Sequence, residues 1–208
     1  MTLSAPRGHR GPGLPSQAGV ALPELLLWMV LAAWVLALTT AGAPRLKESV
    51  AIRSAVHETT VAFYRARSSA ISRNRNVALK FRKNGPRYEW TVYADGNGNG
   101  VLSSEITNGV DPAIGVYLPW SRNDVFPGIM TGVRVPDPGS PGHYLDRIDD
   151  PIRFNSSDIC SFSGMGESTP GSVYLWDGRD RMAVVRVLGS TARVRTLYYR
   201  RGEKGWTP

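Results

Sequence analysis

Cysteine and histidine are scarce in this 208-residue chain, which has one cysteine, Cys160, and three scattered histidines. A single thiol excludes an internal disulfide, and no Cys/His spacing typical of a zinc site occurs. The motifs Gly-x-Ser-x-Gly, His-Glu-x-x-His and the P-loop are also missing from the sequence. The sequence therefore predicts no enzyme, no cofactor and no structural metal site, although a membrane-anchored enzyme is kept as a remote alternative.

Acidic residues are unevenly distributed along the chain, and both its helical segment and its C-terminal end contain few of them. Residues 45–87 carry eleven Lys/Arg but two Glu, residues 88–185 carry six Arg against thirteen acids, and residues 186–208 carry six basic residues against one acid. The net charge is +8. Such an excess suggests an acidic partner, such as nucleic acid or anionic lipid. The alternative interpretation is that the acidic middle packs near the basic helix.

Charge is nearly absent from the segment 20–43, whose only ionisable residue is Glu24. As a helix this segment would be about 36 Å long, enough to cross a bilayer. Residues 1–19 contain arginine but no acid, which places them in the cytoplasm and the rest of the chain across the membrane. A plain anchor or a secretory signal peptide cleaved after Ala41-Gly42-Ala43 are the alternatives.

The junction around Gly19 adds a second feature to this segment. Gly19 is followed by Val20, and Glu24 stands four residues further on, before a long apolar run. A carboxylate in a membrane helix needs a partner, and cleavage after Gly19 would create a positive amine at Val20. The pattern resembles the type IV prepilin family, although Val20 and Pro23 replace commoner residues. The resemblance implies cleavage after Gly19 by a prepilin peptidase, N-methylation of Val20, and a role for Glu24 in filament assembly.

The remaining chain predicts one helix followed by strands. Apolar residues at spacings of three and four extend the helix through residues 44–76, ending near Asn74 to Asn76. Strands are expected within residues 77–208, and the Pro/Gly-rich stretch between Pro119 and Gly171 is either irregular or made of very short strands. The predicted strands are Val77–Phe81, Tyr88–Tyr93, Gly115–Leu118, Val173–Trp176, Met182–Val187 and Arg193–Tyr199. The fold class is α+β and pilin-like, with a long, partly transmembrane N-terminal helix packed on an antiparallel β-sheet domain.

Three further motifs narrow the resemblance. They are an AR-x-x-AI helix (Ala66, Arg67, Ala70, Ile71), the turn Asp95–Gly100, and the run Phe162–Gly166 with Gly171–Leu175. Together they resemble the type II secretion system protein H and FimT-like minor pseudopilins (GspH/FimT). The resemblance implies a structural subunit of the pseudopilus, held in the bacterial inner membrane by one span with its β domain in the periplasm. Expected partners are other minor and major pseudopilins, the inner-membrane assembly platform and the prepilin peptidase.

Two segments carry candidate ligand sites. Asp95, Asn97 and Asn99 match the first half of a calcium loop, but Glu105 falls one position early for the closing ligand, which favours a glycine-rich hairpin turn. Near the C-terminus, four arginines are interleaved with the aromatic residues Tyr198, Tyr199 and Trp206: Arg193, Arg195, Arg200 and Arg201. These residues could grip DNA phosphates, with the aromatic rings stacking on bases. The alternative function is therefore that of a FimT-like minor type IV pilin that binds DNA. The interpretation without any function is a solvent-exposed basic strand edge that prevents aggregation.

Overall fold

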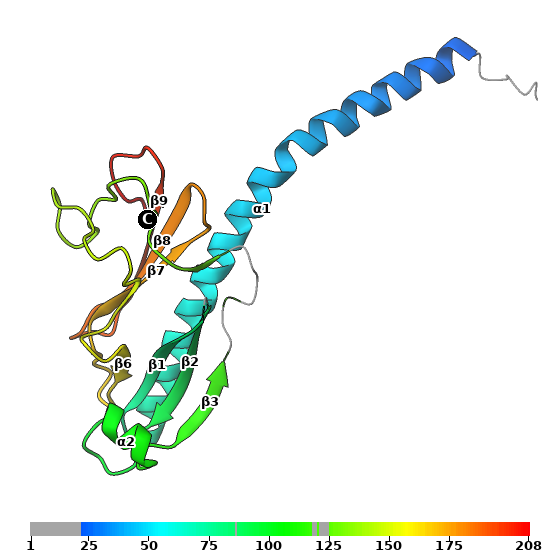
Figure 1. Cartoon of the computed structure of the whole chain (residues 1–208). Coiled ribbons are helices and arrows are strands. Elements are labelled where there is room, and N and C mark those ends of the chain that lie inside the picture. The colour runs from blue at the N-terminus through cyan, green and yellow to red at the C-terminus, as the bar shows by residue number, and fades with distance from the viewer. Residues whose placement is uncertain (1–21, 86, 118–119, 121–124) are drawn as a thin grey trace, which may run out of the picture. The chain divides into compact units, whose positions relative to one another are not determined.

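A computed structural model of the chain describes residues 22–85, 87–117, 120 and 125–208, with the backbone alone for residues 37–48 and 117. The chain forms two compact units, residues 1–44 and 45–208. Helix α1 extends from Leu22 to Arg73, so its first part belongs to the first unit and its second part to the second (Figure 1).

The first unit contributes helical residues whose described side chains, 22–36, are all exposed. Most of them are large and apolar, with exposed fractions from 47% for Leu31 to 78% for Leu22. Among the residues that the structure describes, no helix combines the length and the apolar character needed to span a membrane.

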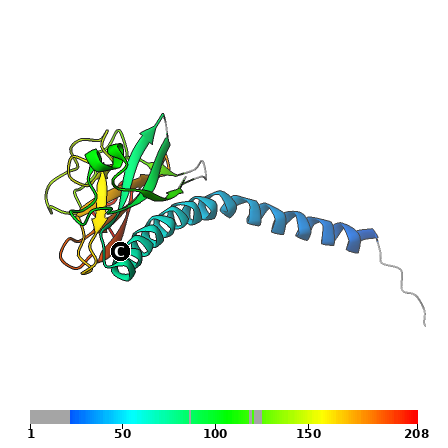
Figure 2. The same ribbon diagram turned by 90° about the horizontal axis from the view of Figure 1, so that it is seen from below.

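The second unit contains two antiparallel sheets and the helical residues 45–73. Sheet A has the strand order β3-β2-β1-β6, with β1 Val77–Asn84, β2 Arg87–Ala94, β3 Ala113–Tyr117 and β6 Ile159–Phe162. Sheet B has the order β4-β7-β8-β9, with β4 Phe126–Pro127, β7 Gly171–Trp176, β8 Arg181–Val187 and β9 Val194–Arg200. Strand β5, Ile152–Arg153, also pairs with β7, and a short helix α2, Ser103–Asn108, lies between β2 and β3. Figures 1 and 2 show α1 running alongside β1 and β2.

The main core lies between α1 and both sheets. Phe63 of α1 is fully buried, and its ring lies 5.9 to 6.4 Å from the rings of Phe81, Phe154 and Phe162. Burial of an aromatic ring of this size contributes about 2–3 kcal/mol. A second cluster fills the other face of sheet B, where Met182, Val184 and Tyr199 pack with Trp206.

The predicted helix face is largely confirmed. Its buried members follow spacings of four and three: Ile52, Val56, Thr59, Phe63, Ala66 and Ala70. Ile71, the last residue of the AR-x-x-AI motif, is half exposed. The helix ends at Arg73, because Asn74 adopts the left-handed conformation (φ 48°) that commonly terminates helices.

All six predicted strands are present, with most ends within two residues of the prediction. Strand β1 ends three residues later than predicted, at Asn84 instead of Phe81. The stretch between Pro119 and Gly171 contains β4, β5 and β6, which are two to four residues long. Antiparallel pairing and the packed helix confirm the α+β fold class. The expected hairpin at Asp95–Gly100 is wrong in detail, because this loop leads from β2 into α2 instead of directly into a strand.

Candidate functional site

The loop Asp95–Gly100 is organised around a buried carboxylate. The Asp95 side chain is 2% exposed and accepts hydrogen bonds from the backbone N–H groups of Asn97, Gly98 and Gly100 (3.2, 2.6 and 2.8 Å) and from Asn76 Nδ2 (2.9 Å). Burial alone would raise the pKa of Asp95, but these hydrogen bonds hold it below its ordinary value.

The other calcium candidates of this loop contact Glu105. Its Oε1 atom accepts hydrogen bonds from Asn97 Nδ2 and Asn99 Nδ2, at 3.0 and 2.7 Å. The amide groups therefore turn their donors, not their oxygens, towards this carboxylate. A calcium ion would have to displace these N–H donors from both carboxylates, so the arrangement supports a self-contained turn.

The four C-terminal arginines divide into two groups. Arg193 and Arg195 lie at the start of β9, and Arg200 and Arg201 lie at its end, all exposed. Arg200 lies five positions after Arg195 along the strand, which corresponds to about 17 Å. Arg201 forms an ion pair with Asp180 (Nε–Oδ1 3.0 Å). The structure therefore does not bring the four arginines together, and one of them is already neutralised.

A fifth arginine joins the first group. Arg186 of β8 lies directly opposite Arg195 in the β8–β9 ladder. Like charges at opposed strand positions repel each other, and an anion can relieve this repulsion. Sequence reasoning missed Arg186 because the register of the hairpin is needed to see this pair.

The aromatic residues of the tail are mostly engaged inside the domain. Tyr199 is 5% exposed, and its ring centre lies 5.4 Å from that of Trp206. Trp206 Nε1 donates a hydrogen bond to the Pro136 carbonyl (2.7 Å). The Tyr198 ring lies under the Arg53 guanidinium, at 5.9 Å. The burial of Tyr199 in the core cluster of sheet B contradicts the expectation that its ring stacks on nucleic-acid bases. Trp206 packs against the same cluster and is half-buried, so its stacking on bases stays a prediction.

The N-terminal candidates are only partly described. Gly19 and Val20 lie outside the described residues. Glu24 lies in the first turn of α1, where a carboxylate interacts favourably with the helix dipole, and it is exposed. All other residues between 22 and 36 are apolar, so the Glu24 carboxylate is the only charged group in this described segment.

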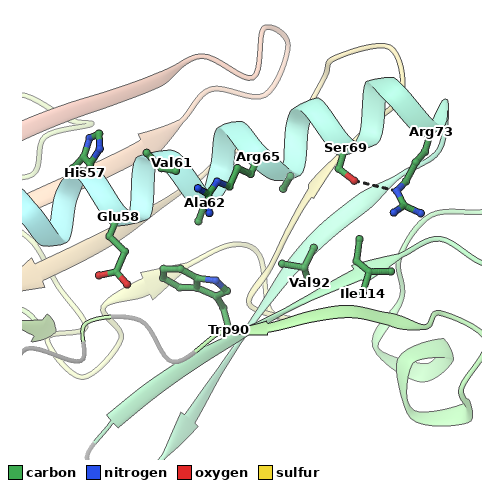
Figure 3. Close-up of a pocket in the computed structure, with 11 residues that line it drawn as sticks. His57, Glu58, Val61, Ala62, Arg65, Ser69, Arg73, Trp90, Val92 and Ile114 are labelled. Atoms are coloured by element: carbon green, nitrogen blue, oxygen red, sulfur yellow. Dashed lines mark hydrogen bonds between the residues drawn. The ribbon is translucent and has the colours of Figure 1, made fainter.

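A groove that the sequence did not predict lies between α1 and strands β2 and β3, with a volume of about 610 Å³ (Figure 3). Trp90 lies towards its Glu58 end, and Val92 and Ile114 lie towards its Ser69 end. The Glu58 carboxylate accepts a hydrogen bond from the backbone N–H of Trp120 (3.2 Å). The remaining lining residues come from α1: His57, Val61, Ala62, Arg65, Ala66 and Arg73.

Comparison with known protein families gives a match over most of the β domain. The profile of the family described as type II transport protein GspH matches residues 55–191, more than half of the 208-residue chain. The matched region begins within α1 and ends in the turn before β9, so Arg193 and Arg195 lie beyond it. No curated protein and no solved structure matches the chain.

Proposed function

Because the chain belongs to the GspH family of type II transport proteins, we propose that it is a minor pseudopilin, a structural subunit of the pseudopilus that takes part in protein secretion across the outer membrane. The family match over residues 55–191 carries this proposal. Family membership also implies interaction with other pseudopilins. The proposed cellular place is the inner membrane, with a single span over residues 20–43 and the β domain in the periplasm.

The first part of α1 supports an assembly role. Its described side chains are exposed and, apart from Glu24, apolar, and an uncovered apolar surface of this size requires lipid or protein around it. We place cleavage between Gly19 and Val20, with methylation of the new amine. Glu24 then pairs with the N-terminal amine of a neighbouring subunit, since a carboxylate in apolar surroundings needs a positive partner.

Secretion tests this role of Glu24. The change Glu24→Gln removes the charge but keeps the side-chain size, and we expect secretion to fall about tenfold or more because each lost buried ion pair weakens assembly. The measurement is the ratio of a secreted protein in the medium to that retained in the periplasm. Glu167→Gln, a matched change at an exposed turn, should leave this ratio unchanged. Full secretion with Glu24→Gln would exclude the assembly role.

DNA binding by a FimT-like minor pilin is the second candidate function. The specific observation in its favour is the Arg186–Arg195 pair, with Arg193 two residues away from Arg195. Arg193 and Arg195 are exposed and Arg186 is half-buried, and within the described residues Arg193 and Arg195 form no ion pair.

The division of the arginines supplies a matched control for this candidate. For the fragment 45–208, the double change Arg193→Ala with Arg195→Ala should lower the slope of log affinity against log salt by about 2, since each phosphate contact contributes about 0.9. The change Arg200→Ala with Arg201→Ala removes the same charge at the other end of β9 and should have the smaller effect. Equal loss with both variants would indicate unspecific attraction, and absence of binding at low salt would remove this candidate.

A further inference from the structure

The groove beside α1 stays open because small residues line the helix side. Ala62, Ala66 and Ser69 face it from α1, and Gly115 stands opposite Val92 in the β2–β3 ladder. The three short side chains and the glycine leave the space between helix and strand open. The Trp90 ring, by contrast, is 3% exposed and forms part of the groove wall.

Strand β3 presents an edge next to this groove. Among the described strands it is one of the two outer strands of sheet A, and β6 is the other. The pairing register between β2 and β3 shifts between Val92 and Tyr93, so Ile114 has no partner on β2. The Ile114 side chain lines the groove and is 40% exposed. Val116 is 68% exposed on the same strand. An edge strand with exposed apolar residues is a template for pairing with another strand.

The rim of the groove is basic. Arg65 and Arg73 line it from α1 (Figure 3). Both residues are exposed. The one carboxylate of the rim, Glu58, already accepts the hydrogen bond of Trp120 N–H. A segment that enters the groove therefore meets two arginines, and carboxylates on that segment would be attracted to them.

We propose that this groove binds an extended, acidic segment of a protein partner. The segment adds to β3 as a further strand, places apolar side chains against Trp90, Val92 and Ile114, and places carboxylates against the two arginines. Backbone pairing supplies affinity and the alternating side chains supply specificity, as in other strand-addition complexes. The proposal depends on residues 57–116 alone, so it stands or falls independently of processing at Gly19.

Site-specific photo-crosslinking in the bacterium that naturally carries the chain tests the occupant. Benzoylphenylalanine replaces Ile114 in the full chain, and the cross-linked peptide is identified by mass spectrometry. We expect a peptide of a different protein that is rich in Asp and Glu and alternates with apolar residues. The same label at the exposed Val116 should capture the same segment, which covers the case in which the first variant does not fold.

A charge reversal tests the recognition itself. Arg65→Glu should lower the cross-linking yield about fivefold or more, because a like charge now faces the acidic segment. The matched change Lys204→Glu lies on the C-terminal tail and should leave the yield unchanged. The proposal is overturned if both labels capture only a second copy of this chain, nucleic acid or lipid, if neither captures anything, or if Arg65→Glu leaves the yield intact.

Discussion

At the scale of single residues, Asp95 shows how a calcium-like pattern builds a turn instead. A calcium loop and a glycine-rich turn both place Asp and Asn at alternate positions, so the sequence alone could not separate them. The difference lies in what the side-chain oxygens face. Here the oxygens of Asp95 face three backbone N–H groups and one amide, which fixes the path of the chain from β2 to α2.

Replacement of Asp95 by asparagine tests this anchoring role. Asp95→Asn should lower the free energy of unfolding by about 2–4 kcal/mol at neutral pH, because hydrogen bonds to a buried carboxylate are lost. Since the pKa of Asp95 is lowered in the folded protein, its contribution is complete above the unfolded pKa of about 3.9 and disappears as pH falls through the folded value. The difference between wild type and variant should therefore shrink below about pH 4.

Urea unfolding from neutral pH down to acid pH measures this difference. Asp149→Asn, at an exposed aspartate, is the control and should change stability by less than about 0.5 kcal/mol. A difference between wild type and Asp95→Asn that stays constant with pH would show that the carboxylate charge is not the stabilising feature.

At the scale of elements, the close approach of β5 to β7 depends on a glycine. A Cβ added at Gly171 would lie 2.2 Å from Phe154 Cδ1 and 2.4 Å from the Arg153 carbonyl oxygen. Phe154 is fully buried and packs on Phe63, so its ring has little room to move. The close packing of β5, β7 and α1 therefore explains why glycine stands at position 171, the start of the Gly-Ser-Val-Tyr-Leu run.

The change Gly171→Ala tests this packing. We expect a loss of about 1–3 kcal/mol in the free energy of unfolding, the usual cost of forcing a methyl group into a filled core. Gly205→Ala, where an added Cβ meets no atom within 4 Å, should be nearly neutral. Chemical unfolding of both variants gives the comparison, and equal stability of the two would contradict the close approach.

The helices and strands also differ in how well the sequence predicts them. The long helix and the strands with alternating residues were predictable, because periodicity reports directly which face is buried. Strands β4 and β5 were not, because two residues carry no period and their pairing is supplied by β7. The arginines near the C-terminus are close in sequence but lie at opposite ends of an extended strand. The groove depends on the spacing between α1 and β3, which no local pattern encodes.

At the scale of the whole molecule, the stabilising contacts are concentrated in one of the two units. Every buried apolar residue of the described structure lies between Ala51 and Tyr199, within the unit 45–208. The described side chains of residues 22–36 bury no core. The fold of the β domain should therefore not depend on the N-terminal segment.

Truncation tests this independence. The fragment 45–208 should unfold in one cooperative transition, with a melting temperature within a few degrees of that of the full chain in detergent. Thermal unfolding followed by near-ultraviolet circular dichroism reports the packing of the buried aromatic residues. A broad transition, or a melting temperature lower by about 10 °C or more, would show that residues 1–44 contribute to the fold.

The N-terminus connects the family assignment to the proposed role in a filament. Glu24 can pair with a neighbouring subunit's amine only if cleavage frees Val20. Mass spectrometry of the mature protein from its own bacterium decides this most directly. The pseudopilin proposal predicts a first residue Val20 that carries an N-methyl group. An intact Met1, or a chain that begins at Pro44, would contradict it.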